Sequence, residues 1–229
     1  TRYLLLRSVE QLAAATGVAR FPPLSPRYNA APGQPLPVVR RRGGKREASL
    51  LRWGLVPAWA ESPRATAPLV NARAESAAAK PAFREPFRSR RCLVPADGFY
   101  EWQPTPHGPM PWLFQPADDG LLCFAGLWET WSAPGAEPLE TFAILTTAPN
   151  SLVAPIHHRM PAILAPNSYD AWLDAATPPQ RLQSLLVACA PALLRTRPVH
   201  PRLNRVGHDD PDCLAPPPSP PASQLDLAL

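Results

Sequence analysis

Residues 91–102, which read RCLVPADGFYEW, form the stretch on which the predicted fold depends. Leu93 and Val94 predict a short buried strand, which Pro95 is expected to end. The pair Asp97-Gly98 then indicates a hairpin turn, in which Gly98 supplies the positive φ that primed turns require. A second strand carrying FYEW begins at Phe99, so the sequence predicts two strands joined by a tight turn.

The second of these strands places an acid among aromatic residues. Side chains alternate between the two faces of a strand, so Glu101 points to the same side as Phe99. If that side is buried, the proton affinity of the carboxylate rises, which suits general acid–base catalysis near neutral pH. An exposed glutamate at a strand end is the alternative, and ionisable residues are mostly exposed.

Composition favours short strands joined by rigid loops. The 229 residues include 34 prolines, and an internal proline breaks a helix because it removes a hydrogen bond and clashes with the preceding turn. A β-rich chain of this length is commonly one domain. The basic run at residues 40–46 is expected to be a solvated hairpin tip. Further strands are predicted at residues 2–7, 36–41, 48–53, 112–115, 123–131, 141–147 and 193–199.

The first helix has clear start and stop signals. Ser8 and Gln11 form a capping box at its beginning, and Gly17 ends it. Val9 and Leu12 contribute to its apolar stripe. The sequence therefore predicts a short amphipathic helix directly after the first strand.

Other helices are expected to be short. Residues 76–80 are rich in alanine, and residues 168–173 have a helical pattern. A further helix begins at Thr177, which is expected to act as the cap, with Pro178 at the first helical position and Gln180 closing the box. Residues 214–229 form a proline-rich, low-complexity tail, whose P-x-x-P pattern is a weak signal for a peptide ligand.

Charge and cysteine usage narrow the class of protein. The formal net charge of +5 weakly favours an acidic partner such as nucleic acid. No apolar run is long enough to span a bilayer and no secretion signal is present, so we expect a cytoplasmic protein without a membrane partner. No C-x-x-C pair indicates a zinc site or a disulfide framework, and no metal or cofactor is expected. We expect Cys92, Cys123 and Cys189 to be small residues of the core.

Five motifs in one order resemble a known family, the SOS response-associated peptidases, also called abasic-site processing proteins. The resemblance extends over residues 2–164 and more weakly to about residue 204. It implies one α+β domain, residues 1–213, with a curved, barrel-like and mainly antiparallel β core flanked by short helices. The motifs are RYNAAPGQ at 27–34, RWGLVPAW at 52–59, VNARAES at 70–76, RCLVPADGFYEW at 91–102 and IHHRMPAIL at 156–164.

The resemblance also implies a catalytic site. The family combines an N-terminal cysteine, exposed by autoproteolytic removal of the initiator Met, with an Asn, a Glu and a His. These three positions match Asn71, Glu101 and His157. Without the resemblance, a residue such as Asn71 more often forms hydrogen bonds with the backbone of its loop. A histidine such as His157 is then more often a polar residue on the surface.

The chemistry of the family explains this set of residue types. An abasic site in single-stranded DNA exposes an aldehyde, which a neutral α-amine attacks to form a Schiff base. A thiol on the same residue then closes a thiazolidine ring, which makes the protein–DNA cross-link lasting. Proton transfer through His157 and Glu101 would serve these steps, while Asn71 would orient the N-terminal residue. The same groups would support strand cleavage by β-elimination, an abasic-site lyase activity.

The N-terminus departs from the family pattern. The family begins Met-Cys-Gly-Arg, and here Arg2 matches the arginine while Thr1 takes the glycine position. We expect the encoded protein to begin Met-Cys-Thr-Arg, and the alternative is a member that has lost its nucleophile. If Thr1 is the terminus, its amine would still form a Schiff base, although a hydroxyl holds the ring less well than a thiol.

The family's DNA groove predicts further contacts. Trp59 matches an aromatic that lies against the bases, and Arg2, Arg73 and Arg159 are expected to contact phosphates. The alternative for Trp59 is a residue packed in the core or a loop. The expected partner is single-stranded DNA containing abasic sites, bound by a monomer.

Two functional classes follow from these observations. The first is an enzyme-like abasic-site sensor that cross-links to DNA, and the second is a non-catalytic single-stranded DNA-binding module with a degenerate site. A third, an ordinary peptidase acting on other proteins, lacks a nucleophile–base pair in the sequence.

Overall fold

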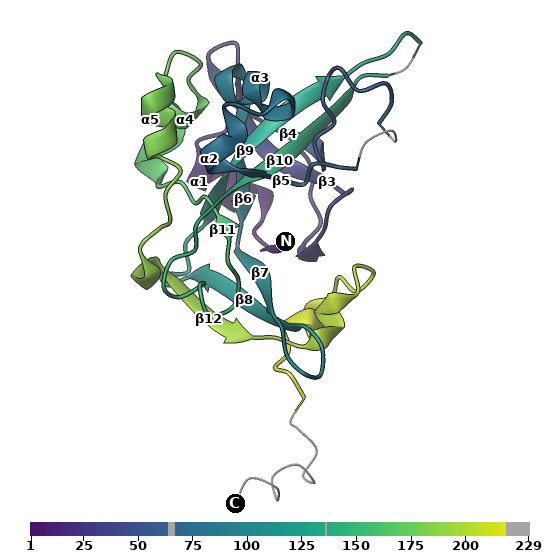
Figure 1. Ribbon diagram of the computed structural model, residues 1–229, viewed down its shortest axis with the longest axis vertical. Helices are drawn as coiled ribbons and strands as arrows, with labels where there is room; N and C mark the ends of the chain where they lie inside the picture. Colours follow the sequence, from purple (N-terminus) through teal and green to yellow (C-terminus); the bar gives the residue numbers. More distant parts are fainter. Residues whose placement is uncertain (64–66, 136, 219–229) are drawn as a thin grey trace, which may run out of the picture.

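The computed structural model describes residues 1–63, 67–135 and 137–218, and its centre is a closed five-stranded barrel (Figure 1). The barrel closes because the last strand pairs back with the first, and only the contact between β10 and β4 is parallel. This confirms the α+β class and the barrel-like core. In order of pairing, the strands are β10 (Leu139–Thr147), β4 (Lys45–Trp53), β3 (Pro35–Arg42), β6 (Arg91–Ala96) and β9 (Leu122–Trp131).

Two short strands extend the barrel wall beside β10. The strand β5 (Asn71–Arg73) pairs with it in parallel, and β11 (Met160–Pro161) pairs with its C-terminal end. Both strands therefore present their connecting loops at the same end of β10.

A second, five-stranded sheet lies below the barrel in Figure 1. Its pairings are all antiparallel. The N-terminus lies between this sheet and the barrel (Figure 1). In order, the strands are β12 (Leu194–Pro198), β8 (Met110–Pro116), β7 (Gly98–Gln103), β1 (Arg2–Leu5) and β2 (Arg27–Ala30).

The predicted hairpin at Asp97-Gly98 is wrong. The strands β6 and β7 do not pair, because β6 belongs to the barrel and β7 to the second sheet. Asp97 fixes this crossing: its carboxylate accepts hydrogen bonds from the backbone amides of Leu6 and Arg7, at 2.5 and 3.0 Å, and pairs with the Arg7 guanidinium at 2.8 Å. The stretch 91–102 therefore links the two sheets instead of folding back on itself.

The residue at position 98 is glycine for a different reason from the one predicted. Gly98 does not have a positive φ. A Cβ at this position would lie 2.6 Å from the backbone oxygen of Phe114, on the neighbouring strand. A close approach of two backbones, and not turn geometry, requires the glycine.

Aromatic rings fill the space where the barrel meets the second sheet. Tyr3 of β1 contacts Trp53 at 5.3 Å and Phe124 at 6.0 Å between ring centroids. Phe99 stacks on Phe114 at 4.9 Å. All five rings are buried, so strands from both sheets share one core.

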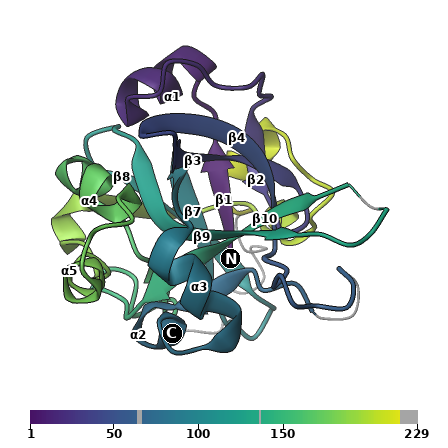
Figure 2. The ribbon, with the colours of Figure 1, turned by 90° about the horizontal axis from the view of Figure 1, so that it is seen from above.

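Helices surround the barrel, as Figure 2 shows from above. The predicted first helix is confirmed as α1 (Val9–Thr16), with the capping box of Ser8 and Gln11 and with Gly17 in the left-handed conformation. The expected alanine-rich helix near 76–80 is displaced and followed by a second, unpredicted helix, α3. The remaining elements are α2 (Ala74–Ala77), α3 (Pro81–Ser89), α4 (Tyr169–Leu173), α5 (Pro179–Ser184) and the 3₁₀ turns Pro166–Ser168, Pro191–Leu193, Pro201–Asn204 and Pro211–Leu214.

The predicted start of α5 is wrong. Pro178 is the cap, in the extended conformation, and no side chain closes a box with Thr177 or Gln180. A residue that precedes a proline avoids the helical region, and Pro179 follows Pro178. The helix therefore begins at Pro179.

Two expectations about burial are also corrected. Arg40 is not part of a solvated tip: it is buried, stacks on Trp128 at 4.5 Å and forms two bonds of 2.6 and 2.7 Å with Glu140. Cys213 lies in a small buried cluster, and Cys189 is only partly buried.

Two sequence expectations concern the membrane and the tail. Among the described residues, no helix is long and apolar enough to cross a membrane. Most of the predicted proline-rich tail lies outside the described residues, which end at 218.

Candidate active site

Glu101 is the buried acid of the candidate site. It lies on β7 with only 4% of its surface exposed, on the same side of the strand as buried Phe99. Removal from water raises the pKa of the carboxyl to about 7, an effect partly offset by the positive α-amine of Thr1. Glu101 thus exchanges a proton near neutral pH.

Strand register brings the N-terminal residue to this acid. Arg2 of β1 pairs with Tyr100 of β7, so Thr1 lies beside Glu101. Burial lowers the pKa of the Thr1 α-amine, although attraction to Glu101 opposes the change. A larger fraction of this amine is therefore neutral, and nucleophilic, than in a peptide in water.

Asn71 contacts the same residue from the barrel side. It begins β5, which is held in register by β10, and its side-chain amide donates a 2.8 Å hydrogen bond to the Thr1 hydroxyl. The Asn71 carbonyl oxygen is buried and has no hydrogen-bond partner in the part of the chain that the structure describes. The amide therefore holds Thr1 and keeps one acceptor free.

His157 completes the cluster from the loop between β10 and β11. Its Nδ1 atom lies 3.4 Å from a carboxylate oxygen of Glu101. The same nitrogen lies 2.9 Å from the backbone oxygen of Arg159 and 3.2 Å from its backbone nitrogen. The adjacent ring of His158 is 4.5 Å away between centroids. The structure thus brings Thr1, Asn71, Glu101 and His157 together.

The residues predicted to contact DNA differ in their exposure to solvent and in the bonds that they already form within the protein. Trp59 is 65% exposed, so it is not a packing residue of the core. Arg73 is exposed and lines a hollow with Glu75, His158 and Arg159, although the Arg159 guanidinium is already paired with Glu75. The hollow also includes His158, the residue that follows His157 in the chain.

Arg2 is already bonded to the protein itself. Its guanidinium donates to the backbone oxygens of Leu203 and Asn204 and to the side chain of Asn29, and it lies over the Trp102 ring at 5.0 Å. These contacts argue against a phosphate role for Arg2. They fix the strand that delivers Thr1 to Glu101.

Sequence reasoning missed the residues that support this strand. The buried amide of Asn29, in the RYNAAPGQ motif, donates to three backbone oxygens between Leu203 and His208. Asp209 accepts from the backbone amides of Tyr28 and Asn29 at 2.6 and 2.8 Å. In the sequence, only the motif itself indicated that Asn29 matters. No residue near Asn29 in the sequence showed that its partners lie about 180 positions away.

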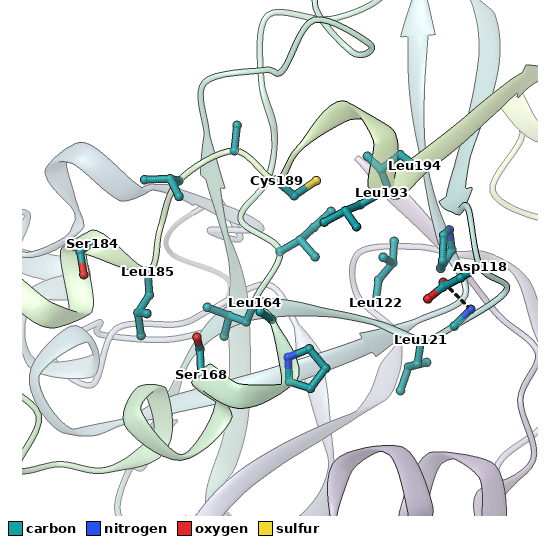
Figure 3. A pocket seen from close by; sticks show the side chains of 17 residues that line it. Asp118, Leu121, Leu122, Leu164, Ser168, Ser184, Leu185, Cys189, Leu193 and Leu194 are labelled. Carbon is teal, nitrogen blue, oxygen red and sulfur yellow. Dashed lines mark hydrogen bonds between the residues drawn. The ribbon is translucent and has the colours of Figure 1, made fainter.

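An apolar hollow lies away from these residues (Figure 3). It is formed by leucines from β9, β12 and the segment after α5, with Cys189 at its wall. Burial raises the pKa of the Cys189 thiol, so it is a poor nucleophile. Across residues 1–63, 67–135 and 137–218, no three His, Cys, Asp or Glu side chains are placed to hold a metal ion.

Comparison with known proteins agrees with the motifs. The model of the family "SOS response associated peptidase (SRAP)" matches residues 1–206. The chain is 39% identical over 190 residues to the abasic site processing protein YoqW of Bacillus subtilis, covering 81% of this chain and 85% of that protein. It is 33% identical to the abasic site processing protein HMCES of Gallus gallus, covering 83% of this chain and 66% of that protein.

Solved structures share the fold. A crystal structure of a protein from Bacteroides thetaiotaomicron matches with a TM-score of 0.73 and 30% identity, over 80% of this chain and 82% of that one. A protein from Bordetella bronchiseptica matches with a TM-score of 0.77 and 24% identity, over 87% and 99%, which supports the fold alone. Because the family model covers residues 1–206 of the 229, the chain belongs to the SOS response associated peptidase family.

Proposed function

We propose that the chain processes abasic sites in single-stranded DNA and captures their aldehyde with its N-terminal residue. The observation that carries the proposal is the cluster in which Asn71 bonds the Thr1 hydroxyl at 2.8 Å and His157 lies 3.4 Å from Glu101, a buried carboxyl of pKa about 7. The names of the relatives YoqW and HMCES support the same substrate.

The first step needs one neutral amine and one available proton. The amine lone pair attacks the aldehyde carbon of the ring-opened sugar as the C=O π pair moves to oxygen, and a proton passes from the nitrogen to that oxygen to give a carbinolamine. Protonated Glu101 then donates to the carbinolamine hydroxyl, which leaves as water and gives a Schiff base. A carboxyl with pKa about 7 is suited to both directions of this transfer.

A cysteine directly before Thr1 would make the adduct lasting. In that protein the Schiff base would form on the α-amine of the cysteine, and the thiol of the same residue would add to the imine carbon while the thiol proton passes to the nitrogen, which closes a thiazolidine ring. In that protein, Glu101 and His157 would also serve the removal of a leading Met by the thiol. In a protein that begins at Thr1, the hydroxyl would close a less stable ring.

Strand cleavage would use the same groups. From the Schiff base, a base removes a proton from the sugar carbon next to the imine, and the 3′ phosphate leaves as the new double bond forms. His157 is the candidate base because it contacts Glu101 and its side chain is the more exposed of the two, at 31% against 5%. This is the lyase activity of the proposal.

DNA binding is assigned to exposed aromatic and basic residues. Trp59 would stack on bases, and Arg73 and Arg159 would contact phosphates. Arg2, held by backbone oxygens, would position Thr1 instead. We expect the protein to act as a monomer.

A single-stranded DNA-binding module without covalent chemistry is the second candidate. It is favoured by the exposure of Trp59 and Arg73, which would bind DNA without any covalent step. The two candidates differ in whether DNA becomes covalently attached.

The test compares two proteins with the same single-stranded oligonucleotide containing one abasic site. One begins at Thr1 and the other carries a cysteine before Thr1, with its N-terminus verified by mass. We expect the second to give an adduct that survives denaturation, and the first to give one only after borohydride reduction. Equal yields without borohydride would contradict the ring-closure step, and no adduct from either would favour the binding module.

A further inference from the structure

Glu75 of α2 makes a specific contact beside the site. Its two carboxylate oxygens accept from the two terminal nitrogens of Arg159, at 2.8 and 2.9 Å. One of these nitrogens also donates to the backbone oxygen of Thr146, near the end of β10. A bidentate ion pair of this kind fixes the orientation of the guanidinium as well as its distance from the carboxylate.

The backbone of Arg159 in turn contacts the imidazole of His157. Its carbonyl oxygen and its amide nitrogen lie 2.9 and 3.2 Å from Nδ1, the nitrogen that faces Glu101. Because the side chain of Arg159 is anchored to α2 and to β10, the turn that carries these backbone groups is anchored too. Strand pairing holds the ends of the loop between β10 and β11, and its first part is held by the side chain of Asn150, which bonds Cys189 and the backbone of Leu152 and Val153.

From these contacts we propose that Glu75 is a positioning residue for His157, acting through Arg159. It touches no reacting atom. The proposal rests on the proposed function for its effect on chemistry, but its structural content concerns the free protein: the Glu75–Arg159 pair holds the Arg159 backbone against Nδ1, so that the imidazole stays directed at Glu101. The pair therefore sets the fraction of molecules in which acid and base are aligned.

The variant Glu75→Gln tests this, because it keeps the size of the side chain and removes its charge. The matched control is Glu85→Gln on α3, since Glu85 also pairs with an arginine, at 2.9 Å, and its side chain is 47% exposed against 54% for Glu75. Both variants would carry the added N-terminal cysteine. Circular dichroism would confirm that each one is folded.

Two readouts separate positioning from DNA affinity. At saturating abasic-site DNA, we expect the single-turnover rate of adduct formation to fall about ten- to a hundred-fold in Glu75→Gln and to stay unchanged in Glu85→Gln. In the free protein, the ¹⁵N chemical shift of His157 Nδ1 should move only in Glu75→Gln. His157→Gln assigns that signal.

The outcomes distinguish a failure of the positioning role from a failure of the proposed function. An unchanged ¹⁵N shift in Glu75→Gln would overturn the proposal, as would an unchanged rate at saturation together with tighter DNA binding, which would make Glu75 a competitor of phosphate. If the parent protein forms no adduct at all, the proposed function fails, while the ¹⁵N comparison still tests the positioning role.

Discussion

Replacing Glu101 with glutamine should make the protein more stable at alkaline pH while removing its proton-transfer group. The carboxyl has an ordinary pKa of 4.5, and burial raises it to about 7 in the folded protein. The folded state therefore binds a proton more tightly than the unfolded state. Its stability falls as pH rises from about 4.5 to 7, because ionisation is then easier in the unfolded chain.

The size of the effect follows from this interval. Each unit of pKa difference is equivalent to about 1.4 kcal/mol, so the burial of Glu101 costs on the order of 3 kcal/mol above pH 7. Below pH 4.5 the carboxyl is protonated in both states and the cost disappears. Glutamine is neutral at every pH, so Glu101→Gln should match the parent at pH 4 and exceed it by about 3 kcal/mol at pH 8.

Urea denaturation at the two pH values measures this difference. The groups facing Glu101 are the Thr1 amine and His157, and both are retained in the variant. Glu85→Gln is the control, because it removes an exposed glutamate from a surface ion pair. In a chain of this size, about 3 kcal/mol corresponds to roughly 6–12 °C in melting temperature.

One result would refute the reasoning. If the difference between Glu101→Gln and the parent is the same at pH 4 and pH 8, Glu101 titrates near its ordinary value. Glu101 would then not be able to hold a proton near neutral pH, and the acid step of the proposed reaction would need another donor.

Further substitutions test DNA contacts and packing. Trp59→Ala should weaken single-stranded DNA binding by about 1–3 kcal/mol at every salt concentration, measured by fluorescence anisotropy; a lower melting temperature with intact affinity would contradict this. Arg73→Ala should instead reduce the slope of log affinity against log salt by about 0.7, and an unchanged slope would count against a phosphate contact. Gly98→Ala places a methyl group 2.6 Å from the Phe114 oxygen and should cost about 1–3 kcal/mol in urea denaturation, whereas parent-like stability would show that the strands can separate. Asn29→Ala should cost about 1–3 kcal/mol by leaving backbone oxygens unpaired, with a slower adduct reaction, and normal rates would show that β1 holds Thr1 without it.

Local patterns predicted the elements whose signals are local. The capping box at Ser8 and the alternation that buries Glu101 with Phe99 depend only on neighbours in sequence, and both are present in the structure. The turn at Asp97-Gly98 has the same composition as a hairpin turn. Whether β7 folds back on β6 or continues into another sheet depends on β1, β3, β8 and β9, which lie far away in sequence.

The site was predictable only through motifs taken together. Nothing near Asn71 shows that it meets Thr1, because β5 is brought there by its parallel pairing with β10. The ion pair between Glu75 and Arg159 joins residues from two motifs and was not visible in either. For the same reason, Arg2 looked like a phosphate contact until its partners at Leu203 and Asn204 were known.

The anchoring of β1 by the segment near residue 204 has a consequence for synthesis on the ribosome. The strand that carries Thr1 emerges first, yet the carbonyl groups that fix Arg2 belong to residues translated about 200 positions later. At ~5–20 residues per second, roughly 10–40 s separate the two. During that time β1 lacks the bonds that fix Arg2. The arrangement of Thr1, Asn71 and Glu101 is therefore complete only when translation of the domain is nearly finished.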